Sequence, residues 1–218
     1  MAKQWVRQEI KRNEIAVLIQ TCLSLYKKKR ESIIVGTGIG IVLIAVVVYF
    51  VMQYMSLNIR AWGELSRAQG MARSGNISQA EINLKEIAQN FKRTPASIHS
   101  LLFLAEIYSR DKKYKMASDI YQQIIDSYRN NTLLPFAYIG LGSSLLNMGN
   151  LDKAVDIYQI FSDKYPDHFL YPVILQSLGY CYEKTNQIDD ARTQYEKIVT
   201  LYPQTIWAEN AYAWLNLL

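Results

Sequence analysis

The sequence predicts an all-α protein: an N-terminal transmembrane helix, then a solenoid of four helix pairs and a terminal helix. One observation is a run of 21 residues without a charged side chain, residues 32–52. The other is a set of small and aromatic residues that recur every 37 residues through the rest of the chain. The predicted parts are a basic tail (1–31), a membrane segment (32–55), a linker (56–60) and a solenoid (61–218).

The basic tail carries the whole net charge of the chain. Residues 1–31 hold eight Lys and Arg against three Glu, and 8 − 3 gives the formal charge of +5. We expect the tail to lie on anionic lipid as an amphipathic helix or to dock on a protein partner, and we expect no nucleic-acid binding from the neutral remainder. Four cations adjoin the apolar run and are predicted to lie at the membrane surface: Lys27, Lys28, Lys29 and Arg30.

The apolar run is long enough to cross a bilayer. As a helix, the stretch SIIVGTGIGIVLIAVVVYFVM would reach about 31 Å, the thickness of the hydrocarbon layer. Its length, and the lack of a small-x-small site after it, favour an uncleaved signal anchor over a cleaved signal peptide. Because the cations precede it, we expect a cytoplasmic N-terminus and residues 56–218 on the outer side of a bacterial inner membrane.

Two glycines within the run have the spacing of a helix-packing motif. Gly36 and Gly40 form G-x-x-x-G, which lets a second helix approach closely in lipid. The alternative is that both are ordinary residues of the span. Under the first interpretation the second helix can come from another copy of this chain, in which case the protein is a homo-oligomer.

The repeat predicts four units, residues 61–97, 98–134, 135–171 and 172–208, with residues 209–218 as a cap. Two columns of small residues recur, each followed at helical spacing by larger apolar or aromatic residues. The small columns are Ala68, Ala105, Gly142 and Gly179, and Ala80, Ala117, Ala154 and Ala191. The large columns are Met71, Tyr108, Leu145 and Tyr182; Leu84, Tyr121, Tyr158 and Tyr195; Ile87, Ile124, Phe161 and Ile198; and Phe91, Tyr128, Tyr165 and Tyr202.

Each unit is predicted to be two helices joined by a short turn. Gly75, Gly149 and Asn186 can supply the left-handed residue that follows a first helix. The small residues let the two helices approach closely, and the neighbouring aromatic rings fill the space beside them. The Tyr-Pro pairs at 165–166 and 202–203 are predicted to end the second helices, with the tyrosine plugging the junction to the next unit.

These columns resemble the tetratricopeptide repeat. The third unit carries the pattern at Tyr138, Leu141, Gly142, Leu145, Gly149, Ala154, Tyr158 and Pro166. The first unit departs from it, with Glu64 and Arg67 where apolar residues are expected, and the 37-residue spacing exceeds the common 34. The long unit is similar to the repeats of exported bacterial proteins such as the Tol–Pal coordinator. The layout resembles the membrane-anchored ancillary subunit of the bacterial Sec translocon.

No constellation of catalytic or metal-binding residues is evident. The two histidines, His99 and His168, lie in different units, and Cys22 and Cys181 fall on opposite sides of the predicted membrane segment. We therefore expect a protein without enzymatic activity, metal or cofactor.

The resemblance implies that the first helices line an inner face that binds extended or helical segments of other proteins. The residues predicted there are Trp62, Leu65, Leu102, Glu106, Phe136, Ile139, Ser143, Leu146, Val173, Gln176 and Tyr180. They are mainly apolar or acidic, which suits a hydrophobic peptide or partner helix and not a clamp for terminal carboxylates. The predicted role is a scaffold or chaperone-like accessory at a translocation or envelope-assembly machine. The alternatives are a permanent structural subunit of a membrane complex, or an inner face partly covered by residues 208–218.

Overall fold

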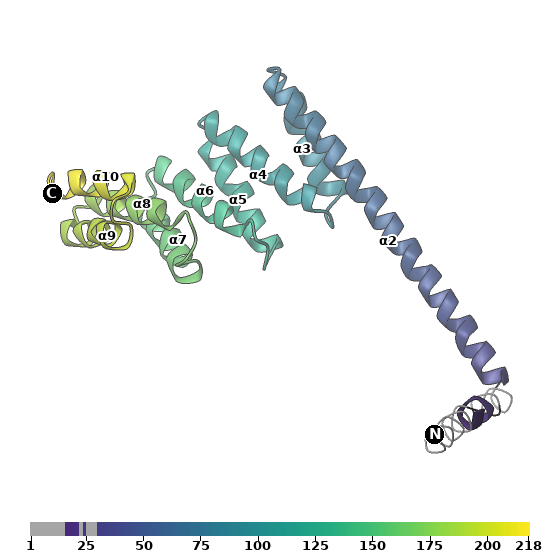
Figure 1. Ribbon diagram of the computed structural model, residues 1–218. Helices are drawn as coiled ribbons and strands as arrows, with labels where there is room; N and C mark the ends of the chain where they lie inside the picture. Colours follow the sequence, from purple (N-terminus) through teal and green to yellow (C-terminus); the bar gives the residue numbers. More distant parts are fainter. Residues whose placement is uncertain (1–15, 22–23, 25–29) are drawn as a thin grey trace, which may run out of the picture. The chain divides into compact units, whose positions relative to one another are not determined.

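A computed structural model describes residues 16–21, 24 and 30–218, and all regular structure in that part of the chain is helical (Figure 1). It confirms the predicted fold class of a long apolar helix, four helix pairs and a terminal helix, and the end of the long helix is also the first helix of the first pair. The helices are α2 (Arg30–Arg73), α3 (Ile77–Asn90), α4 (Pro95–Arg110), α5 (Tyr114–Ser127), α6 (Leu134–Asn147), α7 (Leu151–Lys164), α8 (Tyr171–Lys184), α9 (Ile188–Leu201) and α10 (Ile206–Leu215). Lys27, Lys28, Lys29 and Cys22 lie outside the described residues.

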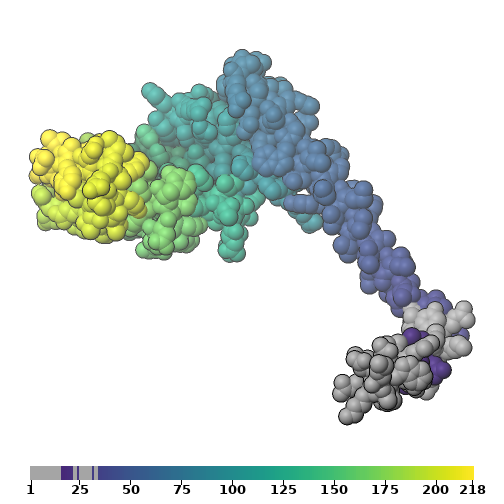
Figure 2. All heavy atoms as spheres, in the orientation of Figure 1, coloured from purple at the N-terminus to yellow at the C-terminus, as the bar shows by residue number. Residues whose placement is uncertain are grey.

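The chain divides into two units between Ser56 and Leu57. Within the first unit, the apolar part of α2 is exposed along its length, as Figure 2 also shows for this segment. Among the described residues, α2 is the helix that is long and apolar enough to cross a membrane, with a mean hydropathy of 2.7 in its most apolar window. Such a helix is compatible with a single-pass anchor or a signal sequence.

Two expectations for α2 can be compared with the structure directly. The helix runs without a break through residues 56–60, so the separate linker expected there is wrong: these residues are helical. The space beside Gly36 and Gly40 is open, because a Cβ added to either would meet no heavy atom within 4 Å. The packing of a second helix against these glycines stays a prediction.

Residues 57–218 form the solenoid, in which consecutive helices from α3 to α10 pack against each other. In addition, α4 contacts α6 and α6 contacts α8, so the first helices of successive pairs form one layer. Figure 1 shows these helices as a series of antiparallel hairpins. The arrangement is that of a helical repeat array, in which each pair is stabilised by its neighbours.

The turns inside the pairs follow the repeat. Gly75 and Gly149 have φ values of 86° and 78°, and Asn186 has a φ of 58°, which confirms the left-handed residue predicted at each. The second pair has Lys112 at the same place with a φ of 58°. The lysine side chain does not favour this conformation, and its place in the repeat, 37 residues after Gly75, is the feature that corresponds to it.

Proline lies at the beginning of the first helices α6 and α8 and, as predicted, directly after the tyrosines that follow the second helices α7 and α9. Pro135 and Pro172 lie in the first turns of α6 and α8. Backbone N–H groups in a first turn have no partner within the helix, so a proline there costs no helical hydrogen bond. Helix α7 ends at Lys164, directly before Tyr165 and Pro166. The Tyr165 ring packs on Tyr138, with 6.0 Å between ring centroids. This contact places the Tyr165 ring against α6, the first helix of its own pair. The predicted contact of the ring was with the junction to the next unit.

The column of tyrosines in the second helices forms the centre of each pair. Tyr158 and Tyr195 are buried, at 1% and 2% exposure. A Cβ added to Gly142 would overlap the Tyr158 ring, and one added to Gly179 would overlap the Tyr195 ring. The small and aromatic columns therefore meet in space, as the repeat predicted.

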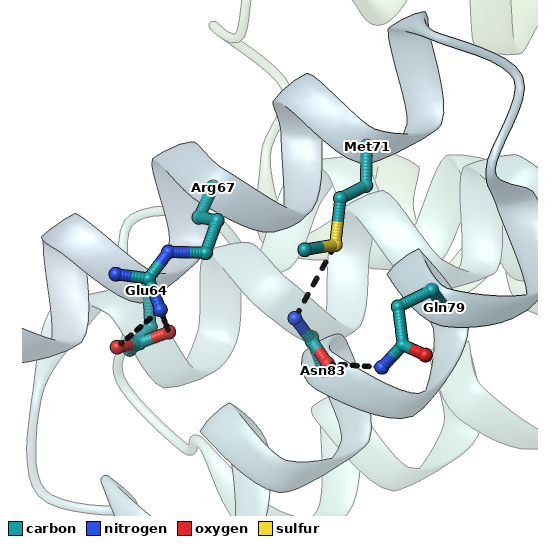
Figure 3. Close-up of polar contacts among 5 residues, drawn as sticks. All are labelled: Glu64, Arg67, Met71, Gln79 and Asn83. Atoms are coloured by element: carbon teal, nitrogen blue, oxygen red, sulfur yellow. Dashed lines mark hydrogen bonds and ion pairs between the residues drawn. The ribbon is translucent and has the colours of Figure 1, made fainter.

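The first pair ends the stack with a polar face (Figure 3). Glu64 and Arg67 form an exposed ion pair of 3.1 Å, whereas the equivalent residues of the second pair, Leu101 and Leu104, are buried. Asn83 of α3 donates a hydrogen bond to the Met71 sulfur of α2 at 3.4 Å. A terminal repeat needs a polar outer face, because within residues 57–218 no helix pair precedes the first one and covers that face.

The Cys181 thiol is expected to resist alkylation in the folded protein. It is fully buried, and burial raises its pKa to about 11, so little thiolate forms at neutral pH. Because the folded pKa exceeds the ordinary value of 9.0, the neutral thiol stabilises the fold at low pH and this contribution is lost as pH rises from 9 to about 11. Iodoacetamide labelling of a Cys22→Ser variant at pH 8 checks this. Labelling as fast as in denaturant would contradict it.

Candidate protein-binding surface

The first helices present aromatic side chains that are large and half exposed. Trp62, Phe136 and Tyr180 have exposed fractions of 40%, 40% and 41%. They come from α2, α6 and α8, that is, from three of the four pairs. Exposed aromatic rings in rows of this kind are typical of surfaces that bind other proteins.

The structure places the other predicted residues of this face at different depths. Half-buried are Leu102, Ile139, Leu146, Val173 and Gln176, whereas Glu106 and Ser143 are exposed. Glu106 is paired with Arg110 one turn along α4, at 2.5 Å. If the Glu106 carboxylate bound a ligand, it would first have to leave Arg110. The apolar residues of this face are therefore the better candidates for binding groups.

Leu65 does not belong to the surface. It is 2% exposed and lies in the core cluster with Ala61 and Ala68, its neighbours at four and three residues along α2. Residues at this spacing share one face of a helix, so Leu65 points inward with them. The prediction that Leu65 is available to a ligand is corrected accordingly.

Three of the predicted residues meet in one pocket of about 400 Å³. Leu146 of α6 and Gln176 and Tyr180 of α8 line it, and it is completed by Ser177, Glu183, Tyr195 and Trp214. The Tyr195 hydroxyl donates a hydrogen bond to the Glu183 carboxylate. Burial first, and then this carboxylate, raise the pKa of Tyr195 above its ordinary value, so the hydroxyl remains a donor at neutral pH.

The terminal helix supplies one wall of this pocket. The Trp214 ring lies 5.0 Å from the Tyr195 ring between centroids, and Tyr180 keeps 41% of its surface exposed. One prediction from the sequence is that residues 208–218 partly cover the inner face. In the structure α10 lines the pocket through Trp214 and leaves Tyr180 exposed. No column of the repeat indicated that Trp214 would form part of this pocket.

A second aromatic group surrounds Phe136. Its ring lies 6.1 Å from His168 and 6.2 Å from Phe169, and Phe169 is 70% exposed. Both neighbours belong to the segment between α7 and α8, which the repeat treats as a connection. The missed signal is the pair of aromatic residues directly after Asp167 in a turn, where polar residues are the rule.

At the other end of the inner face, His99 packs on Trp62 with 5.1 Å between centroids. Burial lowers the pKa of His99, so its imidazole is neutral at pH 7. The described residues also contain no group of three or more His, Cys, Asp or Glu side chains that could hold a metal ion. The chemistry offered by this face is therefore contact with apolar and aromatic groups.

Comparison with known proteins supports the same fold. The family model of the tetratricopeptide repeat-like domain matches residues 24–210. A search of the curated proteins finds no match. Among solved structures, a tetratricopeptide repeat protein of Parabacteroides merdae is similar with a TM-score of 0.61 and 20% identity, over 72% of this chain and 59% of that one. This chain thus spans less than two thirds of that protein.

Two further structures show the same arrangement of helices. Residues 41 to the end of MamA from Desulfovibrio magneticus match with a TM-score of 0.58 and 19% identity, over 72% of this chain and 82% of that one. A kinesin light chain-like repeat protein of Podospora anserina matches with a TM-score of 0.54 and 16% identity, over 67% and 76%. At these identities the likeness concerns the fold alone. Because the family model covers most of its length, the chain belongs to the tetratricopeptide repeat-like domain family.

Proposed function

We propose that this protein is a membrane-anchored module that binds another protein through the inner face of its repeats. Helix α2 would hold it in the membrane, and residues 57–218 would work outside the cytoplasm as an accessory scaffold at a translocation or envelope-assembly machine. The fold supports the general part, because tetratricopeptide repeats act as protein–protein interaction modules. The charge of residues 27–30 and the layout of the chain support the compartment that we propose.

The observation that carries the proposal is the row of half-exposed aromatic residues on the first helices. Burying an exposed aromatic ring removes a large apolar area from water, and such rings dominate binding energies at protein interfaces. Phe136 and Tyr180 lie on neighbouring first helices, and Tyr180 also lines the 400 Å³ pocket. A hydrophobic stretch or an amphipathic helix of the partner fits these features.

The experiment replaces Phe136 and Tyr180 with serine. Loss of one aromatic anchor is expected to cost about 2 kcal/mol, which weakens partner binding about thirtyfold, and loss of both should weaken it by up to roughly 800-fold if the two costs add. Both side chains are half exposed, so the thermal midpoint should change little. A photoreactive residue at position 136 in intact membranes identifies the partner, and titration of the purified partner onto each variant measures its affinity.

The matched control removes two apolar side chains from second helices instead. Met116→Ser and Ile160→Ser change residues that are 43% and 37% exposed on α5 and α7. They should leave the affinity unchanged. If both double variants weaken binding equally, the inner face is not the binding surface.

A permanent structural subunit would use the same face without releasing its partner. The two roles differ in how fast the bound partner is exchanged for a free one. A receptor should exchange a labelled partner for an unlabelled one within minutes in purified membranes, whereas a structural subunit should keep the label after hours.

A further inference from the structure

A second pocket, separate from the inner face, lies between the ends of α5 and α7 and the beginning of α6. Its volume is about 630 Å³, and none of the eleven residues predicted for the inner face lines it. Two segments that are distant in sequence contribute to it: residues 125–138, from the end of α5 into the first two turns of α6, and residues 164–165 at the end of α7.

The floor of this pocket is apolar. Leu134 and Tyr138 are buried, and Ile125 and Tyr165 are half buried. The Tyr138 and Tyr165 rings pack together with 6.0 Å between centroids. Packed rings of this kind give a firm surface on which a large apolar side chain can lie.

The rim carries two cations that have no acidic partner. Arg129 is exposed and makes no hydrogen bond or ion pair within the described part of the chain. Lys164 donates a hydrogen bond to the Tyr138 hydroxyl at 2.9 Å and lies 5.2 Å from the centroid of its ring, so its partner is a neutral phenol. By contrast, the four ion pairs described for this chain join other cations to Asp or Glu side chains.

The remaining polar groups at the rim also offer donors. Asn131 accepts a hydrogen bond from the Leu133 N–H with its Oδ1 at 2.9 Å, which leaves its NH2 group to donate. Asp126, the acidic residue of the rim, already accepts a hydrogen bond from the Gln122 amide at 3.0 Å. The pocket therefore combines an apolar floor with a rim that has more donors and positive charge than acceptors.

This combination is absent from the equivalent places of the other pairs. The residues at the position of Arg129 are Lys92, Pro166 and Pro203, and those at the position of Lys164 are Asn90, Ser127 and Leu201. Repeat packing alone therefore does not require the two cations. Their meeting at one junction is a local departure from the repeat.

We propose that this pocket binds an acidic segment of a partner protein, in which Asp or Glu adjoins a large apolar residue. The carboxylate would bind Arg129 and Lys164, and the apolar side chain would lie on Tyr138 and Tyr165. Charge complementarity selects this occupant, because a guanidinium forms paired hydrogen bonds with a carboxylate and the apolar floor beside them can take up the neighbouring side chain. The proposal goes beyond binding at the inner face and does not depend on it.

The test uses the full-length protein in nanodiscs of neutral lipid and two labelled peptides. One contains Phe-Asp-Asp-Phe, and the other has Asn in place of both Asp. Fluorescence anisotropy should show binding of the first peptide, with the second at least about tenfold weaker because it lacks the charge. Arg129→Gln/Lys164→Gln should lose binding of the acidic peptide by a similar factor, while glutamine can still donate to Tyr138.

The control variant, Arg192→Gln/Lys197→Gln, removes two exposed charges from α9 and should bind the acidic peptide like the wild type. Equal losses in both double variants would mean general electrostatic attraction and would overturn the proposal, as would absence of binding at millimolar peptide. Arg129→Gln alone guards against misfolding, because its side chain has no described contact to lose. Competition by acetate at the peptide's own concentration would show a site for a free anion and not for a peptide.

Discussion

Replacing Gly142 with leucine is expected to destabilise the repeats strongly. Even a Cβ at this position would overlap the ring of Tyr158, which is 1% exposed and has no room to move. Overpacking of a close contact costs about 1–3 kcal/mol, and a leucine should reach or exceed the upper end. For a domain of this size that corresponds to a fall of roughly 6–12 °C in the thermal midpoint. Near-UV circular dichroism of the full chain in detergent measures it.

Gly70→Leu is the matched control for this experiment. Gly70 lies in α2 within the same repeat array, and a Cβ added there would meet nothing within 4 Å. Leucine favours the helix over glycine by up to about 1 kcal/mol, so the midpoint should stay or rise. A second check combines Gly142→Ala with Tyr158→Ala: the pair should be less destabilised than the sum of the singles, because Tyr158→Ala removes the ring that the added methyl group would overlap. Equal melting of Gly142→Leu and Gly70→Leu would show that the two columns do not touch.

The features that the sequence predicts well are those repeated in it. Each turn residue and each contact between a small and an aromatic residue recurs in several units, so one unit supports the interpretation of another. Lys112 was not predicted to be left-handed, because a lysine side chain does not favour that backbone, yet it adopts the conformation of the residues at the same place in the other units. Gly179 and Tyr195 behave as Gly142 and Tyr158 do.

The features that the sequence does not predict lie at the ends of the array and in its connections. Leu65 was placed by helical phase, but it shares a face with two buried alanines in the first pair, where the repeat is weakest. A linker is predicted from the sequence at residues 56–60, where the helix α2 continues without a break. Phe169 and Trp214 reach the surface from a connection and from the terminal helix, where no other unit offers a comparison.

Two lysines placed in the apolar part of α2 are expected to release the protein from membranes. Ile41 and Ile44 lie near the middle of the uncharged run. On the scale of insertion free energies, each change from isoleucine to lysine costs about 3–4 kcal/mol at a helix centre. The thirteen Ile, Val, Leu and Phe residues of the run contribute roughly −4 to −8 kcal/mol in total, so the double change offsets most of it. Carbonate extraction of isolated membranes should find the wild type in the pellet and most of the variant in the supernatant.

The control adds the same charges where no lipid is expected. Ile82 and Met116 are 51% and 43% exposed on α3 and α5, so lysine at both should be tolerated and the protein should stay in the pellet. If the α2 variant also stays, the protein is held to the membrane by a partner and not by lipid contact with α2. That outcome would leave the fold of residues 57–218 untouched, because it concerns a separate unit of the chain. It would, however, remove the positive-inside argument, since the position of residues 27–30 beside α2 indicates orientation only if α2 crosses the bilayer.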